Sequence, residues 1–209
     1  MIISLTGFMG CGKSSVGRRL SELLCCSFMD LDDVIVERAG RSIPEIFATD
    51  GEAVFRQMEH DVLRDIVASA ERHSVPEAPS QPIENSTIVL ALGGGAVMQE
   101  ECEKMVHEGT VCIYLKASID TLLSHLEDQA DGRPLLNNTP VMSSEAPSVM
   151  SSEAPSVMSS EVETSPLRKR ILELMSLRSA TYERTAHHII DTDGKSIEDI
   201  AAEIIGLFS

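Results

Sequence analysis

Short apolar runs alternate along the chain with longer segments that have helical periodicity. The apolar runs are rich in β-branched residues and predict strands; they cover residues 2–5, 26–30, 87–92, 111–115 and 187–191. Between them, apolar positions recur at the spacing of one helix face; these segments include 15–24, 34–39, 51–70, 119–126, 167–186 and 197–207. Such alternation predicts a three-layer α/β fold, with a five-stranded parallel sheet covered by helices on both faces.

A glycine-rich segment at residues 7–14 directly follows the first predicted strand. It reads GFMGCGKS, which matches the G-x-x-x-x-G-K-S motif of phosphate-binding loops. Backbone N–H groups in such a loop point at phosphate oxygens, and the next helix adds the partial positive charge of its N-terminus. We expect Lys13 to reach the β- and γ-phosphates and the Ser14 hydroxyl to ligate Mg²⁺. The predicted nucleotide site consists of Gly10, Cys11, Gly12, Lys13, Ser14 and Ser15.

Two carboxylates, Asp30 and Asp32, follow the second predicted strand. Ligands of open α/β sheets bind at the carboxyl ends of the strands, where these residues and the glycine loop both lie. One aspartate could stand near Mg²⁺ through water, and the other could accept a proton from a substrate hydroxyl. The alternative is an acidic turn that caps the helix predicted at 34–39.

An arginine and a triple glycine are further candidates for a ligand site. Arg56 has apolar neighbours, so it is either a surface residue with a packed stem or a guanidinium fork aimed at a carboxylate. Gly93, Gly94 and Gly95 end the strand predicted at 87–92. Three glycines favour a close approach of the backbone to a ligand over a plain turn.

Composition narrows the class of partner. The 209-residue chain has a net charge of -16 and 3% aromatic residues, which argues against a nucleic acid or an anionic membrane surface. No apolar stretch is long enough to span a membrane, and the first strand begins at residue 2, so we expect no leader peptide. Five cysteines lack metal-ligand spacing, and the pair Cys25-Cys26 is interpreted as core filler. We expect a cytoplasmic protein and a monomer.

An eight-residue repeat interrupts the pattern after residue 140. The segments at 141–148 and 149–156 both read VMSSEAPS, and the segment at 157–164 begins in the same way. Such a tract has no strand or helix period with which to build a core. We interpret 141–164 as a flexible insertion in a surface loop, which costs little loop-closure entropy.

The ordered set of motifs resembles the shikimate kinase family. It consists of the glycine loop at 7–14, Asp30-Leu31-Asp32, Gly51-Glu52 with Phe55-Arg56 and Glu59, Gly93-Gly94-Gly95, Arg133-Pro134-Leu135-Leu136, and Arg178 with Tyr182. The resemblance covers most of the chain, and it implies one P-loop kinase domain over 1–209. Within it, a substrate-binding helical region would span 30–60, and a mobile lid would span 127–165.

The resemblance implies that ATP phosphorylates the 3-hydroxyl of shikimate, with Mg²⁺ as cofactor, in aromatic amino-acid biosynthesis. Lys13, Asp32 and Arg133 would be catalytic, and Arg133 would also contact ATP from the lid. Ser14 would ligate Mg²⁺, with Asp30 and Asp32 reached through water. The implied shikimate-binding residues are Asp32, Arg56, Gly94, Gly95 and Arg178.

His125 is the departure from the family that bears on the nucleotide. It stands about where many members have an arginine that stacks on adenine, so the resemblance implies a weaker contact there. Two other functions stay open. One is a similar kinase acting on another small molecule, such as gluconate, and the other is a nucleotide-binding relative that has lost catalysis.

Overall fold

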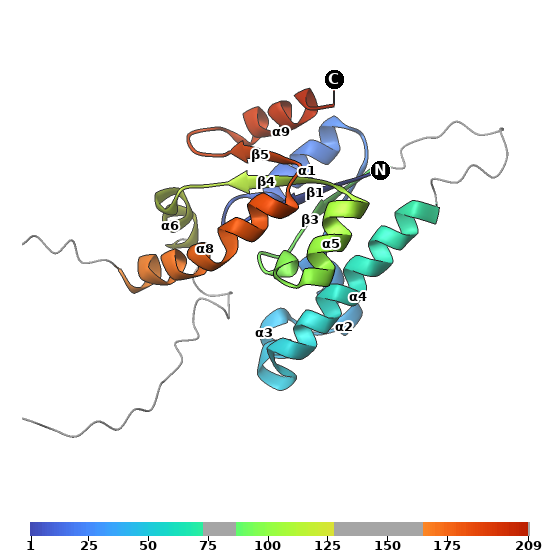
Figure 1. Cartoon of the computed structure of the whole chain (residues 1–209), viewed down its shortest axis with the longest axis vertical. Helices are drawn as coiled ribbons and strands as arrows, with labels where there is room; N and C mark the ends of the chain where they lie inside the picture. Colours follow the sequence, from blue (N-terminus) through green and yellow to red (C-terminus); the bar gives the residue numbers. More distant parts are fainter. Residues whose placement is uncertain (73–86, 128–164, 209) are drawn as a thin grey trace, which may run out of the picture.

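Five parallel strands form one sheet in the computed structural model, which describes residues 1–72, 87–127 and 165–208 (Figure 1). The strands are β1 (Ile2–Thr6), β2 (Ser27–Asp30), β3 (Ile88–Ala91), β4 (Val111–Lys116) and β5 (His188–Asp191). Their order is β2-β3-β1-β4-β5, and Ile3 of β1 lies opposite Val89 and Val111 of its two neighbours. The predicted five-stranded parallel sheet is confirmed.

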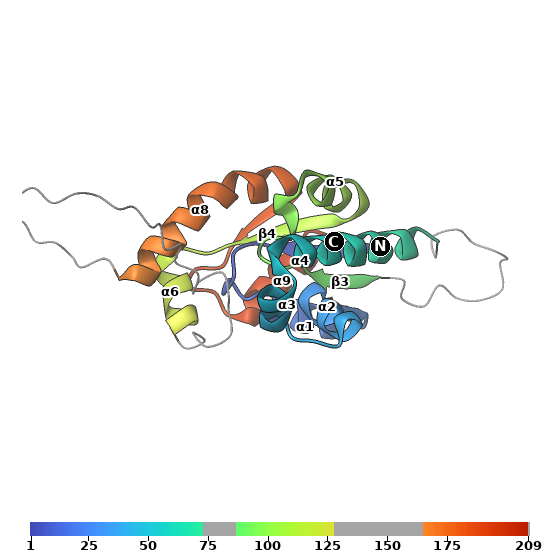
Figure 2. The ribbon, with the colours of Figure 1, turned by 90° about the horizontal axis from the view of Figure 1, so that it is seen from below.

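Helices cover both faces of this sheet. They are α1 (Lys13–Leu23), α2 (Leu31–Ala39), α3 (Ile43–Thr49), α4 (Gly51–Arg72), α5 (Glu100–Gly109), α6 (Ile119–Glu127), α8 (Pro166–Thr185) and α9 (Ile197–Gly206), with a 3₁₀ turn η1 (Ala96–Met98). Figure 2 shows α1 and α9 on one side of the strands and α5 and α8 on the other. In Figure 1, α3 and the first turns of α4 lie at the end of the molecule opposite α9. The predicted three layers are therefore present.

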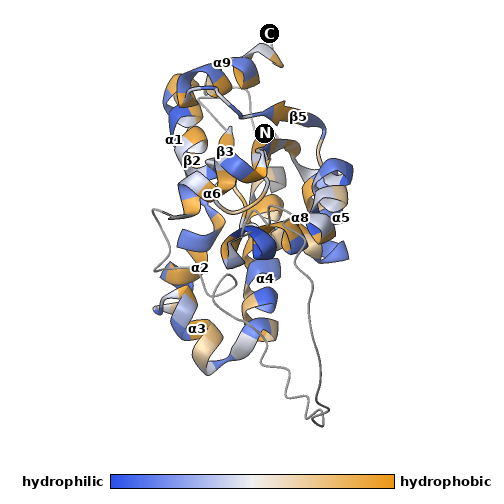
Figure 3. Ribbon diagram, turned by 90° about the vertical axis from the view of Figure 1, so that its left-hand side faces the viewer, coloured by the Kyte–Doolittle hydropathy of each residue, from blue (hydrophilic) through white to orange (hydrophobic). Residues whose placement is uncertain are grey.

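The core forms between the sheet and the inner faces of the helices. All five residues of β1 are buried, and bands of hydrophobic and hydrophilic residues alternate along α9 in Figure 3. The rings of Tyr114 on β4 and Tyr182 on α8 pack with centroids 5.3 Å apart. Each fully buried large apolar side chain contributes about 1.5–3 kcal/mol to stability. This packing fixes α8, and with it Arg178, against β4, which neighbours the strand that leads into the glycine loop.

Helix α2 begins three residues before the predicted start at Val34. The cause is Asp30, whose Oδ1 accepts a hydrogen bond from the main-chain N–H of Asp32 at 3.1 Å and so caps the helix. As a result, Asp32 lies in the first turn of a helix and not in a loop.

The turn after α1 contradicts the interpretation of Cys25-Cys26 as core filler. Cys25 has a φ of 49° and is exposed, because the tight turn points its side chain away from the sheet. Cys26 is partly buried and packs against the core. None of the five cysteines, all of which lie in the described ranges, forms a disulfide.

Two predictions fall outside these ranges. Residues 128–164 are not among those described, so the lid at 127–165 with Arg133 and the insertion at 141–164 stay predictions. Among the helices that are described, none combines the length and the apolar character that crossing a membrane requires.

Candidate active site

The glycine loop connects β1 to α1 at the carboxyl end of the sheet. Gly10 and Gly12 have φ values of 85° and 92°, a left-handed conformation that glycine adopts at little cost. Gly12 is the N-cap of α1, and no side chain caps this helix, so the N–H groups of its first turn are left to face a ligand. Such a terminus attracts anions. The loop therefore has the backbone geometry of a phosphate site.

Lys13 places a positive charge on this loop. Its Nζ donates hydrogen bonds to the main-chain oxygens of Gly7 and Phe8, each at 3.0 Å. The buried Sγ of Cys11 lies 3.9 Å from the same nitrogen. A phosphate group on the loop would therefore meet an ammonium that is already held there, which is the role predicted for Lys13.

The Ser14 hydroxyl donates to Asp30 Oδ2 at 2.5 Å. The other oxygen of Asp30 caps α2, so the helix-cap alternative is observed, and the role near Mg²⁺ stays a prediction. Hard oxygen ligands such as a hydroxyl and a carboxylate are the donors that Mg²⁺ prefers. The two side chains therefore fit a magnesium ion beside the phosphate loop.

Asp32 and Glu59 meet at Gly93. A Cβ atom on Gly93 would lie 2.6 Å from Glu59 Oε1 and 2.9 Å from Asp32 Oδ1, so only glycine fits between the two carboxylates. Burial, followed by the charge of Asp30, raises the pKa of Asp32, while Lys13 lowers it. A carboxylate of this kind is suited to accept a proton from a hydroxyl.

Glu59 was quoted in the sequence motif but was not predicted as a site residue. Its side chain is 1% exposed, and Oε1 has no hydrogen-bond partner in the described part of the chain. Burial raises its pKa to about 6, against the opposing effect of Arg56. Arg56 and Glu59 are three residues apart on one helix, and this spacing could have indicated that the two side chains pair.

Arg56 lies between two carboxylates and the triple glycine. Its Nη1 contacts Glu59 Oε2 at 2.5 Å, and its Nη2 contacts Glu52 Oε1 at 3.1 Å. A Cβ on Gly95 would stand 2.6 Å from Nη1, so the guanidinium lies directly against this glycine. The side chain is only 17% exposed, which favours the guanidinium fork over the surface residue.

A second arginine reaches the triple glycine from α8. Arg178 Nη1 donates to the main-chain oxygen of Gly94 at 3.3 Å, and the Tyr182 hydroxyl donates to the same oxygen. Arg178 is buried, with its guanidinium carbon 5.9 Å from the centroid of the Phe8 ring. Two guanidinium groups thus flank Gly94 and Gly95, and a guanidinium is the side chain best suited to bind a carboxylate.

A cavity of about 580 Å³ joins the nucleotide side of this region to the two aspartates. Its lining includes every predicted nucleotide-binding residue that the structure describes, together with Asp30, Asp32, Gly94 and His125. Arg56, Gly95 and Arg178 are not part of its lining and lie against the triple glycine instead. Arg133 belongs to the residues that are not described.

The far wall of the cavity was not predicted. It is formed by the turn after β5 and the start of α9, with Thr192, Lys195, Ser196, Ile197 and Ile200. His125 stands on α6, and its Nδ1 lies 2.8 Å from the main-chain oxygen of Gly10. The turn after β5 begins at the edge of the sheet where the glycine loop also begins, because the two strands are parallel. This topological argument could have identified the turn as part of the site.

The comparisons with known proteins agree with this geometry. The family model described as shikimate kinase matches residues 9–208. A shikimate kinase from Salinibacter ruber is 32% identical over 98% of this chain and 83% of its own, and one from Thermus thermophilus is 34% identical over 97% and 87%. The solved structure of a shikimate kinase from Acinetobacter baumannii in complex with shikimate has a TM-score of 0.74 and 28% identity, and covers 99% of this chain and 92% of that one.

The fold and the site together define a P-loop kinase, in which a glycine loop and the Asp32 carboxylate line one cavity. Within that class, the chain belongs to the shikimate kinase family.

Proposed function

We propose that this protein transfers the γ-phosphoryl group of ATP to the 3-hydroxyl of shikimate. The observation that carries the proposal is the meeting of three groups at the triple glycine: Asp32 at Gly93, Arg178 at Gly94 and Arg56 at Gly95. A substrate bound there has hydroxyls for the carboxylate and a carboxylate for the two arginines. The phosphate loop lies on the other side of Asp32 in the same cavity.

In this mechanism Asp32 acts on the attacking hydroxyl. It accepts a hydrogen bond from that hydroxyl and takes its proton as the oxygen bonds to the γ-phosphorus. The bond from that phosphorus to the bridging oxygen breaks, and ADP leaves with the electron pair. The raised pKa of Asp32 brings its proton affinity closer to that required of a base at neutral pH.

Positioning and charge stabilisation supply most of the rate in phosphoryl transfer. Lys13 and the N–H groups at the start of α1 neutralise the phosphates. Ser14 and Asp30 would hold Mg²⁺, which supplies further neutralisation when bound. Arg133, from the predicted lid, adds a cation during transfer, and closure of a lid excludes water that would hydrolyse ATP.

The test is ATP turnover with Mg²⁺, measured with and without shikimate, followed by identification of the product. We expect ADP release to depend on shikimate and the product to be shikimate 3-phosphate. Phosphorylation of gluconate in its place would refute the substrate assignment and retain the class. ATP binding without turnover on either compound would refute catalysis altogether.

A further inference from the structure

The position of Arg56 relative to the triple glycine depends on how two separate segments pack. Arg56 lies on α4, whereas Gly95 leads into η1 and α5. The guanidinium lies so close to Gly95 that a single added carbon would overlap it at 2.6 Å. A small shift of the start of α5 along α4 would therefore change the space in which a carboxylate must fit.

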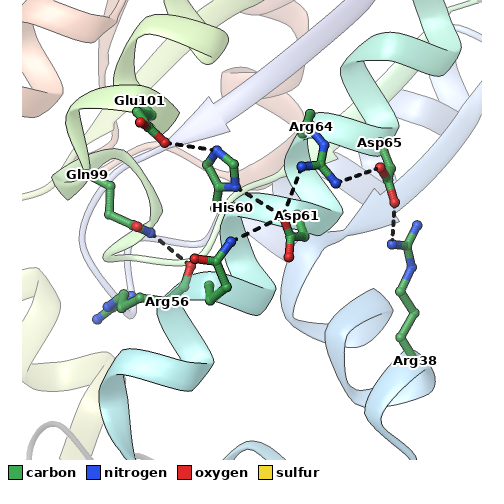
Figure 4. A network of polar contacts seen from close by, with 9 residues as sticks. Arg38, Arg56, His60, Asp61, Arg64, Asp65, Gln99 and Glu101 are labelled. Atoms are coloured by element: carbon green, nitrogen blue, oxygen red, sulfur yellow. Dashed lines mark hydrogen bonds and ion pairs between the residues drawn. The ribbon is translucent and has the colours of Figure 1, made fainter.

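A hydrogen bond from Gln99 connects these two segments at Arg56. It is the N-cap residue of α5, but its side chain makes no capping hydrogen bond. Its Nε2 instead donates to the main-chain oxygen of Arg56 at 3.1 Å (Figure 4). Short polar side chains are the favoured caps. Gln99 has a longer amide side chain, which reaches the neighbouring helix and does not cap α5.

His60 makes a second connection one turn further along α4. Its Nε2 lies 3.2 Å from Glu101 Oε2 in the first turn of α5, and its Nδ1 lies 3.2 Å from Asp61 Oδ1. The histidine side chain is 17% exposed, and Figure 4 shows it pointing from α4 toward Glu101. The start of α5 is thus attached to two successive turns of α4.

The same network continues to the helix that carries Asp32. Arg64 contacts Asp61 at 3.2 Å and Asp65 at 3.5 Å, and Arg38 of α2 contacts Asp65 at 2.7 Å (Figure 4). Helix α4 is therefore connected by side chains to α5 on one side and to α2 on the other. Helices α2 and α4, which carry Asp32 and Arg56, thus share one set of polar contacts with the start of α5, which follows the triple glycine in the chain.

We propose that Gln99 and His60 are positioning residues that hold Arg56 against the triple glycine and so set the affinity for the substrate carboxylate. The proposal rests on the proposed function, in which Arg56 binds that carboxylate. Neither residue needs to touch the substrate, because each acts on the placement of α5 against α4. Replacing either residue should not change nucleotide binding, which is assigned to Lys13, Ser14 and the cavity wall.

The first measurement compares kcat and both KM values in Gln99→Met and His60→Phe, which keep side-chain size and remove the polar contacts. Loss of the Gln99 contact is expected to raise the KM for shikimate about three- to tenfold. Loss of the His60 contact should raise it less, because its partner Glu101 is 83% exposed. The KM for ATP and kcat should stay within about twofold, because weaker binding of the substrate carboxylate alters neither ATP binding nor the chemical step. Glu100→Gln, an exposed change in the first turn of α5, is the matched control and leaves both KM values unchanged.

A double-mutant cycle with Arg56→Lys separates positioning from a general structural role. Lysine keeps the charge but loses the fork, so it raises the KM for shikimate by itself. Gln99→Met then adds little in the Arg56→Lys background. An equal rise in both backgrounds, or no rise in wild type, overturns the positioning role.

If Arg56→Lys leaves the KM for shikimate unchanged, the assignment of Arg56 to the substrate fails, and this inference fails with it. If Arg56→Lys is effective and Gln99→Met is not, only the positioning role fails. Melting temperatures report folding of each variant. If Gln99→Met does not fold, Gln99→Asn, whose shorter amide cannot span the same distance, takes its place in the cycle.

Discussion

Replacing Glu59 with Gln removes a buried charge and keeps the shape of the side chain. The pKa of Glu59 rises from an ordinary value of 4.5 to about 6 in the folded protein, and burial is the largest cause. A shift of this size corresponds to about 2 kcal/mol of folding free energy. The expected effect of the substitution is therefore a change in how stability depends on pH.

The sign follows from the direction of the shift. Because the folded pKa is raised, the contribution of Glu59 is fully present below pH 4.5 and is lost as pH rises through about 6. Wild type should lose about 2 kcal/mol over this window relative to Glu59→Gln, whose amide does not titrate. The assay is the free energy of unfolding from denaturant titrations of both proteins across the window. A difference between the two that stays flat with pH would refute the reasoning.

The same variant has a consequence for binding. Glu59 holds Arg56 through a contact of 2.5 Å, and a hydrogen bond to a charged group contributes about 1.5–3 kcal/mol. The KM for shikimate should therefore rise about tenfold to a hundredfold, while the KM for ATP stays the same. Glu52→Gln is the matched control, since it removes the other partner of Arg56, which is 56% exposed, and should raise the KM less. Equal effects of the two variants would contradict the special role of the buried carboxylate.

Four further outcomes follow from the site. Asp32→Asn should leave ATP binding nearly unchanged and lower kcat by about 10²–10⁴, and an unaffected kcat would remove Asp32 from the chemistry. Gly95→Ala should raise the KM for shikimate, since its Cβ would overlap the Arg56 guanidinium; an unchanged KM in titrations with shikimate would contradict the close approach. His125→Arg should lower the KM for ATP in the same kinetic assay, whereas a higher KM would argue against a contact with the base. Deletion of 141–164 should retain turnover in a folded protein, and loss of turnover would show that the repeat is required.

The sequence was sufficient for the sheet and the phosphate loop, because these depend on local patterns. Strand runs and helical periodicity identify elements one at a time, and the glycine loop is a continuous segment. The pairing of Glu59 with Asp32 depends instead on α4 meeting Gly93, a contact between segments that are distant in the chain. Periodicity contains no information on such a contact, so the buried carboxylate was not recognised.

Asp30 illustrates a different limit of prediction from the sequence. A role near the metal and a helix cap were considered as alternatives, but one carboxylate oxygen caps α2 while the other accepts from Ser14, so the cap does not exclude the metal role. The far wall of the cavity, at Thr192 and Lys195–Ile197, was missed for a third reason. The turn has no sequence motif of its own, and it lines the cavity because β5 ends at the same edge of the sheet as the glycine loop.

The two oxygens of the Asp30 carboxylate bind different partners, and this has a consequence for the evolution of the enzyme. One oxygen belongs to the nucleotide side through Ser14, and the other fixes the start of the helix that carries Asp32. A mutation at this position would disturb the Ser14 hydroxyl at the phosphate loop and, at the same time, the first turn of α2. Changes on the nucleotide side and in the helix that carries Asp32 are therefore coupled through one side chain.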